Sequence, residues 1–330
     1  MNNRRKLIFA LGAGALAAPL IPYAQQKPRM WRVGFLAQRA RPAAMDPDIY
    51  GAFPRGMREL GYVEGRNLVI EWRFADGKID RLPALASELA ALKPDVIVAG
   101  ATPSVQAVHK ATATIPIVLV AVPDPVGEGF VKSLPRPGAN ITGLSTIVTE
   151  VSTKHLELLR LVDPKLARVA VLMNPLNPSD SLILEQINGA AFAVGVKVHP
   201  FEASTAGQLE ASFAAMTRAR VGAVIVAADY LFYGQRAEIA RLAIKNRLPT
   251  ISPNREDAEA GGLISYGQNL AQHYQRAAIY VDKIFKGAKA GDLPVEQPTL
   301  IELVVNQKTA KAIGVKVPNS ILLRADKVIE

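Results

Sequence analysis

Polar side chains follow several apolar segments of this chain, and their types suit the two ends of a zwitterion. Thr102 and Ser104 flank Pro103 at the expected start of a helix. Free backbone N–H groups and the positive end of the helix dipole make such a start suited to a carboxylate. A plain helix N-cap without a ligand is the alternative role, and the sequence leaves both open.

Two aspartates end apolar runs and are suited to a cation. Asp124 follows IVLVAV, and Asp229 follows AVIVA. A carboxylate at either place could accept a charge-assisted hydrogen bond from an ammonium group, about twice as strong as a neutral one. Capping or turn formation is the other interpretation of both. Tyr230, Phe232 and Tyr233 lie beside Asp229 and could stack on an apolar or aromatic ligand, or pack against a neighbouring lobe.

Further polar residues stand at other expected strand ends. In open α/β sheets, ligands bind in the crevice outside the carboxyl ends of the strands. The sequence therefore predicts one ligand-binding cleft. Its candidate residues are Gln38, Thr102, Ser104, Asp124, Asn174, Asn177, Asp229, Tyr230 and Asn254.

Motifs for catalysis are missing from the sequence. It holds no G-x-S-x-G, no G-x-x-x-x-G-K-[ST] and no H-E-x-x-H. The four histidines have no metal-ligand spacing. The absence of cysteine excludes disulfides, thiolate metal sites and a lipid-anchored N-terminal cysteine. We expect no catalytic residue, no metal and no cofactor.

Composition indicates a large globular protein. The chain has 330 residues, of which 49% are hydrophobic, enough for two lobes with their own cores. The net charge of +10 is spread thinly, without the basic run interleaved with aromatics that a nucleic-acid surface shows. We expect no nucleic-acid partner.

The N-terminus has the pattern of an export signal. Arg4-Arg5-Lys6 precedes an uncharged apolar stretch over 7–21, shorter than the roughly 20 residues of a membrane-spanning helix. Cleavage after Ala24 is expected, with Ala17 as the alternative. The paired arginines resemble a twin-arginine signal, and an ordinary Sec signal remains open. The sequence thus predicts a signal peptide over 1–24 and a periplasmic protein.

These polar residues would be positioned by alternating strands and helices. Strands are expected over 31–37, 67–74, 95–100, 117–122, 168–173, 197–201, 223–227, 248–252, 263–266 and 300–306, with a further short strand between Gly138 and Gly143. Helices are expected over 49–60, 80–92, 102–113, 151–162, 179–194, 206–218, 232–246, 270–286 and 308–313. Continuous Val/Ile runs between helices indicate parallel sheets buried on both faces.

Two successive blocks of this kind predict an α/β protein with two doubly wound parallel-sheet lobes joined by three crossover segments. The N-terminal lobe would span 29–147 plus about 265–290, and the C-terminal lobe 148–264 plus about 291–330. Hinges are expected near 144–146, 253–254 and 297–299. One large Rossmann-type domain with a cap is the competing architecture.

Four segments resemble a known family. They are GFVKSLPRPGANITG over 129–143, REDAEAGG over 255–262, SYG over 265–267 and DLPVEQP over 292–298. The chain from about residue 30 onward is similar to the substrate-binding proteins of ABC transporters with the type I periplasmic binding protein fold. Some members bind tryptophan or related amino acids.

The resemblance implies a receptor that binds a small molecule, without catalysis or cofactor, and hands it to the membrane permease of an ABC importer. We expect a monomer. The ligand favoured by the residues is a small zwitterion, such as an α-amino acid with an aromatic or branched side chain; a sugar and a plain aromatic carboxylate are the competitors. A periplasmic sensor partner that presents its ligand to a signalling receptor, or a Rossmann-type enzyme, are the alternative functions.

Overall fold

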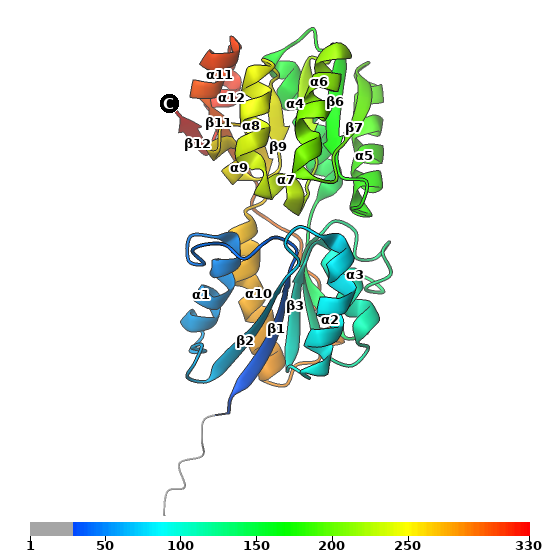
Figure 1. Ribbon diagram of the computed structural model, residues 1–330, viewed down its shortest axis with the longest axis vertical. Helices are drawn as coiled ribbons and strands as arrows, with labels where there is room; N and C mark the ends of the chain where they lie inside the picture. Colours follow the sequence, from blue (N-terminus) through cyan, green and yellow to red (C-terminus); the bar gives the residue numbers. More distant parts are fainter. Residues whose placement is uncertain (1–28) are drawn as a thin grey trace, which may run out of the picture. The chain divides into compact units, whose positions relative to one another are not determined.

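The first sheet of the computed structural model, which describes residues 29–330, contains five parallel strands (Figure 1). Their order is β2-β1-β3-β4-β5. The strands are β1 (Trp31–Ala37), β2 (Leu68–Phe74), β3 (Val96–Gly100), β4 (Ile117–Val122) and β5 (Ile141–Ser145). The export signal expected over 1–24 lies outside the described residues.

Helices cover both faces of this sheet because its central strands are apolar on both sides. In β3, Val96 and Val98 face the core under α1 (Ala52–Glu59) and α10 (Leu270–Phe285). Ile97 and Ala99 face the opposite core, under α2 (Leu82–Ala91) and α3 (Ala101–Ala111). Successive side chains point to opposite faces of a strand, so this unbroken apolar run buries both faces at once.

The second sheet has seven strands in the order β12-β11-β10-β9-β8-β6-β7. They are β6 (Arg168–Met173), β7 (Lys197–Glu202), β8 (Ala223–Val226), β9 (Thr250–Ser252), β10 (Ile264–Gly267), β11 (Glu302–Asn306) and β12 (Lys327–Ile329). Only the β10–β11 pair is antiparallel among the pairs of these strands.

The helices of the second sheet also lie on both faces. α4 (Val148–Val162) and α5 (Ser179–Ala193) share one core with Val169 and Val171 of β6. α6 (Leu209–Arg218) and α8 (Arg236–Lys245) share the other with Ala170 and Leu172. The shorter helices are α7 (Tyr230–Gly234), α9 (Arg255–Glu259), α11 (Gln307–Ile313) and α12 (Asn319–Leu322). Single 3-10 turns lie at Ile49–Gly51, Ile79–Arg81, Ala206–Gln208 and Ala290–Asp292.

Two doubly wound lobes joined by three segments confirm the predicted fold class. The strands belong to two separate sheets, so the single Rossmann-type domain is excluded. In both lobes the first five strands follow one order: β2-β1-β3-β4-β5 corresponds to β7-β6-β8-β9-β10.

The crossings differ in part from the expected hinges. The first joins Ser145 to Val148, and the third follows Glu296, whose carbonyl accepts a hydrogen bond from the Ser145 backbone at 2.9 Å. The second lies at 268–269, between β10 of the second sheet and α10 of the first lobe. The hinge predicted at 253–254 is therefore wrong, because β9 and α9 on either side of it both belong to the second lobe.

One predicted helix is divided. The pattern over 232–246 is two helices, α7 and α8, that meet at Gln235. α7 begins earlier than expected because the Asp229 side chain caps it, accepting from the Leu231 N–H at 2.7 Å. The short elements α9, α12 and β12 were not predicted, because three to five residues are too few to show a periodicity.

Gly143 in β5 lies against the backbone of β4. Its φ is +137°, and a Cβ built there would be 2.1 Å from the Leu119 carbonyl oxygen. Only glycine fits such a backbone approach without moving a strand. The glycine that ends the RPGANITG segment thus has a structural role in the first sheet.

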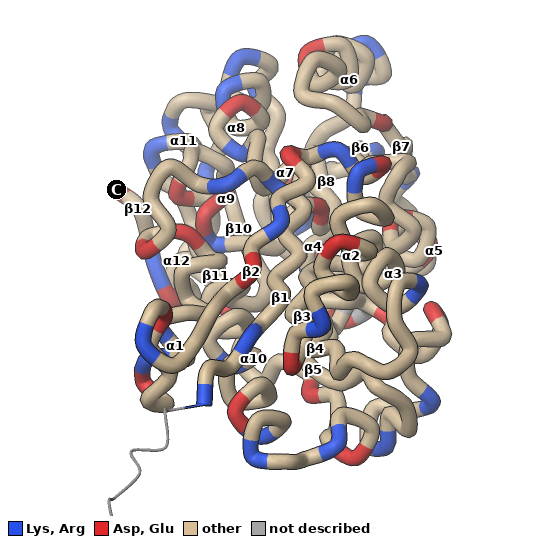
Figure 2. The backbone as a smooth tube through the Cα atoms, turned by 60° about the horizontal axis from the view of Figure 1, so that its bottom comes forward, with Lys and Arg blue, Asp and Glu red and all other residues tan. Residues whose placement is uncertain are grey.

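The surface carries both signs of charge. Lys/Arg and Asp/Glu positions are interspersed along the backbone in Figure 2. No helix within residues 29–330 is long and apolar enough to cross a membrane.

Candidate ligand-binding site

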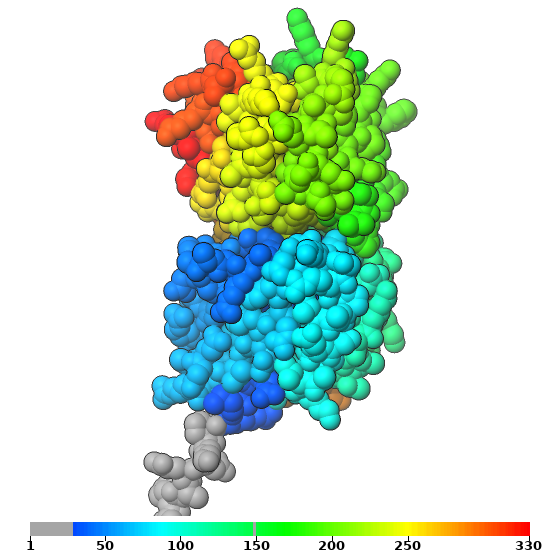
Figure 3. Space-filling model, viewed as in Figure 1, coloured from blue at the N-terminus to red at the C-terminus, as the bar shows by residue number. Residues whose placement is uncertain are grey.

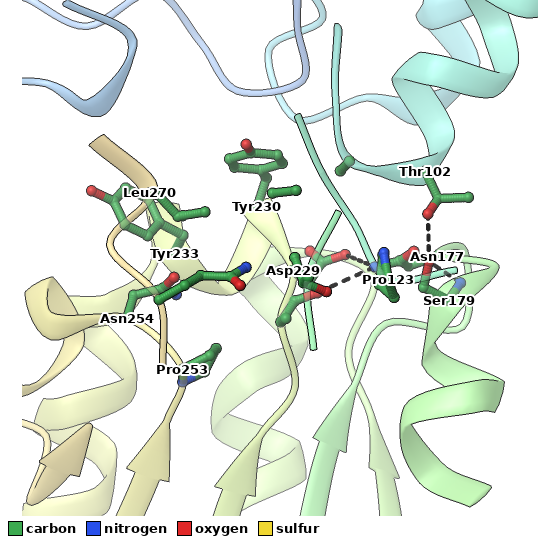
Figure 4. A pocket seen from close by; sticks show the side chains of 15 residues that line it. Thr102, Pro123, Asn177, Ser179, Asp229, Tyr230, Tyr233, Pro253, Asn254 and Leu270 are labelled. Atoms are coloured by element: carbon green, nitrogen blue, oxygen red, sulfur yellow. Dashed lines mark hydrogen bonds between the residues drawn. The ribbon is translucent and has the colours of Figure 1, made fainter. Parts of the chain in front are cut away.

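A cavity lies between the two lobes (Figure 4). It holds about 580 Å³ of space not filled by atoms, part of it open to solvent. We call it the interlobe cavity. Its lining is Ala101, Thr102, Ala121, Pro123, Thr146, Asn177, Ser179, Ala228, Asp229, Tyr230, Tyr233, Pro253, Asn254, Gln268 and Leu270. On the face shown in Figure 3 the lobes meet along a seam.

The topology explains why these residues meet. The strand order reverses between β1 and β3 in the first lobe, and between β6 and β8 in the second. Helices leave to opposite faces at such a switch point, which opens a crevice at the carboxyl ends of the strands. Thr102 follows β3, Asn177 follows β6 and Asp229 follows β8. The interlobe cavity is formed where the two crevices face each other.

Five of the nine residues predicted from sequence line this cavity, namely Thr102, Asn177, Asp229, Tyr230 and Asn254. Asn174 lies one hydrogen bond away, with its Nδ2 donating to Asp229 Oδ2 at 3.3 Å.

The other three predicted residues lie outside the lining. Asp124 caps its own turn, where Oδ1 accepts from the Gly127 N–H at 2.8 Å. Ser104 is buried inside α3, and Gln38 is buried at the end of β1. Their position after a strand could not distinguish these three residues from those that line the cavity. A side chain one position further along a helix or turn points in another direction, away from the cavity.

Asp229 is the buried carboxyl group of the cavity. Its Oδ2 accepts from Asn177 Nδ2 at 3.0 Å and from Asn174, while Oδ1 accepts from the Leu231 N–H. Burial raises the pKa of Asp229, and these three donors act in the opposite direction. Asp229 caps α7, which is one of the two roles considered from sequence, and it also lines the cavity, where a cationic group could contact it.

Asp180 is a second buried carboxylate that sequence reasoning missed. Its Oδ2 accepts from the Asn174 N–H at 2.5 Å, and its Oδ1 has no partner among the described residues. Burial raises the pKa of Asp180 to about 8, and the neighbouring charge of Asp229 adds to the rise. Asp229 accepts hydrogen bonds from three donors and Asp180 from one, so Asp229 is the better placed of the two carboxyl groups to carry a negative charge.

The first lobe contributes a helix start to the cavity. α3 begins at Ala101 after Gly100, with no side-chain cap, and Ala101 has a φ of +61°. A left-handed conformation at a non-glycine residue is a strained one, and such strain gathers at binding sites. The uncapped N–H groups and the dipole of this 11-residue helix favour an anion.

Side-chain contacts join the lobes around the cavity. Thr102 Oγ1 and Ser179 Oγ are 2.6 Å apart, across the gap drawn in Figure 4. Tyr230 reaches into the first lobe, where its Oη lies 2.6 Å from Tyr274 Oη. Tyr233 also packs on the first lobe, and its ring lies under the Arg39 guanidinium, 4.8 Å from the centroid.

Phe232 does not share this position. It is buried in the α6–α8 core of the second lobe. Of the three aromatics, Tyr230 and Tyr233 line the cavity and pack against the other lobe. Phe232 points inward because it lies on the opposite side of α7.

The linking segments contribute lining residues that the sequence did not reveal. Thr146 and Gln268 belong to two of the three crossings, and Leu270 begins α10. Gln268 Oε1 is buried and has no hydrogen-bond partner among the residues described. Ala121 has a φ of +57°, next to an irregularity in the β4–β5 pairing. The sequence around these residues contains no motif that indicates a ligand site. Only the topology identifies them as lining residues.

Two doubly wound lobes, joined by three segments around a shared cavity, define the fold of type I periplasmic binding proteins. Residues 41–329 match the model of the family "ABC transporter substrate binding protein", and the chain belongs to that family. The family is a class of solute-binding proteins, not of enzymes. The predicted resemblance is confirmed.

Relatives with described ligands are similar over most of the chain. A tyrosine-binding protein of Clostridioides difficile is 27% identical over 264 residues, which cover 80% of this chain and 76% of the relative. The structure of an ABC domain from Streptococcus pneumoniae in complex with L-Trp superposes with a TM-score of 0.83 at 25% identity. It covers 91% of this chain and 100% of its own.

A third comparison concerns the conformation. The ligand-free, open structure of a substrate-binding protein with adhesive properties from Clostridium difficile is 26% identical and covers 91% of this chain and 99% of its own. Its TM-score is 0.64, against 0.83 for the L-Trp complex. The arrangement of the lobes described here therefore resembles the liganded structure more than the open one.

Proposed function

We propose that this protein is the extracytoplasmic receptor of an ABC importer and that it binds a small α-amino acid in the interlobe cavity. One observation carries the ligand class: an uncapped helix start of one lobe and a buried carboxylate of the other line a single cavity. These two features match the carboxylate and the ammonium group of an amino acid.

The carboxylate would bind at the start of α3. Ala101 and Thr102, the first two residues of α3, line the cavity from the first lobe, and no side chain caps this helix start. Backbone donors at a helix start hold an anion without the entropy loss of a long flexible side chain. The first lobe supplies no acidic residue to the lining, so nothing there repels the anion.

The ammonium group would bind at Asp229, with the buried Gln268 Oε1 as a second acceptor. A ligand that contacts α3 at one end and Asp229 at the other joins both lobes. Such contacts exist only when the lobes are together, so binding would stabilise the closed arrangement. The receptor, a monomer, would then present its closed form and the bound ligand to the membrane permease.

The relatives support an aromatic ligand. The name of one refers to tyrosine binding, and another was solved with L-Trp. A sugar is disfavoured, since Trp31 and Trp72, both in strands of the first sheet, are outside the cavity lining.

A thermal-shift screen against amino acids, aromatic acids and sugars tests this function. We expect aromatic or branched amino acids to raise the melting temperature, because ligand at 100 times its Kd adds about 2.7 kcal/mol of stability. Sugars should leave it unchanged. A shift with 3-phenylpropionate but with no amino acid would refute the role of Asp229 as an ammonium acceptor.

Export is the second part of the proposal. We expect protein from a periplasmic extract to begin after Ala24, as the charged and apolar pattern of 1–24 predicts. Intact-mass spectrometry measures this, and a cytoplasmic protein with its N-terminus intact would contradict it. Replacing both Arg4 and Arg5 with lysine should block export by the twin-arginine route; unchanged export would indicate Sec.

A further inference from the structure

A second cavity lies inside the second lobe, under α4. It holds about 460 Å³ of space not filled by atoms, part of it open. Its walls include Val151 of α4, Ile183 and Ile187 of α5, and Ile225 of β8. We call it the α4 cavity.

The α4 cavity adjoins the interlobe cavity. Thr146, Ala228, Pro253 and Gln268 line both. Ala228 precedes Asp229, so the shared wall lies beside the proposed ammonium site. A ligand held at Asp229 is thus one residue away from the second space.

The lining of the α4 cavity is apolar and carries no formal charge. None of its residues is Asp, Glu, Lys or Arg. Its one histidine, His155, is buried, and burial lowers the pKa of His155 to about 4, so the ring stays neutral at physiological pH. His155 Nε2 lies 2.6 Å from the Tyr266 carbonyl oxygen and, in the neutral ring, donates its proton there.

The α4 cavity is partly open and lies beside polar groups that converge from both lobes. An apolar pocket with a few convergent polar groups is typical of a small-molecule site. Here the convergent groups are those of the interlobe cavity.

We propose that the α4 cavity receives the side chain of the ligand, while the interlobe cavity holds its ammonium and carboxylate groups. This inference rests on the proposed amino-acid binding and adds which amino-acid side chains the receptor would select. The side chain would lie among Val151, Ile183 and Ile187. Tyr230, expected from sequence to cover it with Phe232, instead joins the lobes by its contact with Tyr274.

This assignment selects large uncharged side chains. An aromatic or branched side chain would fill the α4 cavity and gain roughly 10- to 150-fold in affinity over glycine through apolar burial. A lysine, arginine or glutamate side chain would place an unpaired charge in an uncharged space and be rejected.

Filling the cavity from one wall tests the proposal. Ile187 is 1% exposed on α5, and Ile187→Trp would occupy the space meant for the ligand. We expect about a 10- to 150-fold loss of affinity for L-tryptophan and L-leucine by isothermal titration calorimetry, with glycine binding changed less than about threefold. Asn188→Trp is the matched control, because Asn188 is the next residue of α5 and is exposed.

A second variant from the opposite wall guards against misfolding of the first. Val151→Phe adds a smaller ring from α4, and Ile187→Ala enlarges the same space. Val151→Phe should move the preference toward smaller amino acids, and Ile187→Ala toward larger ones. Circular dichroism of each variant checks that it is folded.

The outcomes separate the two proposals. Selective loss of large ligands in Ile187→Trp or Val151→Phe, with Asn188→Trp unchanged, supports the α4 cavity as the side-chain site. Unchanged tryptophan affinity in folded filling variants overturns it and leaves amino-acid binding intact. Absence of amino-acid binding by the wild-type protein overturns the proposed ligand class, and the side-chain site with it.

Discussion

Asp229→Asn should lower the affinity for an amino acid at least about 30-fold, because it removes one partner of a buried charge pair, a loss of about 2–5 kcal/mol. The affinity for the deaminated analogue should change less than about threefold, since that ligand has no ammonium group. L-phenylalanine and its deaminated analogue 3-phenylpropionate are suitable ligands for this comparison. Isothermal titration calorimetry of both with the wild-type and variant proteins measures the difference.

Asp124→Asn is the matched control for this substitution. Asp124 also ends an apolar strand and also caps a turn, but it does not line the interlobe cavity. Its change should leave both affinities as they are. If Asp229→Asn weakens both ligands equally, Asp229 acts only as the cap of α7, and the ammonium site lies elsewhere.

Gly143→Ala should lower the free energy of unfolding by about 3 kcal/mol or more. The new Cβ would lie 2.1 Å from the Leu119 carbonyl oxygen, and both atoms belong to paired strands that cannot separate without losing ladder hydrogen bonds. The φ of +137° adds strain for any residue with a Cβ. Urea unfolding followed by circular dichroism measures the change.

Gly189→Ala provides a control of opposite sign. Gly189 lies within α5, and a Cβ built there meets no atom within 4 Å. Alanine should stabilise the helix by about 0.5–1 kcal/mol. A Gly143→Ala protein as stable as wild type would show that β4 and β5 separate more easily than their pairing indicates.

Sequence periodicity was sufficient for the fold because the strands are unambiguous. Runs such as VIVAG of β3 and VAVLM of β6 carry no polar side chain, which is typical of a sheet covered on both faces. The second hinge was misplaced because β10 is only four residues long. Nothing in those residues shows that they pair with β9 and not with the first sheet.

The lining of the interlobe cavity was predictable where the chain turns at a strand end. Sequence placed Thr102 and Asp229 in the cleft, and both line the cavity, because a switch point places such residues in the crevice. Asp180 was missed, since it lies inside the first turn of α5 and resembles an ordinary acidic residue at a helix start. The α4 cavity could not be predicted at all, because Val151 and Ile187 show the spacing of core residues.

The Thr102–Ser179 and Tyr230–Tyr274 contacts join the two lobes directly, through protein side chains alone. Two neutral hydrogen bonds contribute about 1–3 kcal/mol. Moving an equilibrium between an open and a closed state from 1:99 to 99:1 takes about 5.5 kcal/mol. These two hydrogen bonds alone would supply between about a fifth and a half of that free energy. Under the proposed function, the receptor itself would supply part of the free energy of closure, and the ligand would supply the rest. The same contribution would narrow the difference in closure between the empty and the loaded receptor, so a permease that recognises closure alone would also encounter empty receptors.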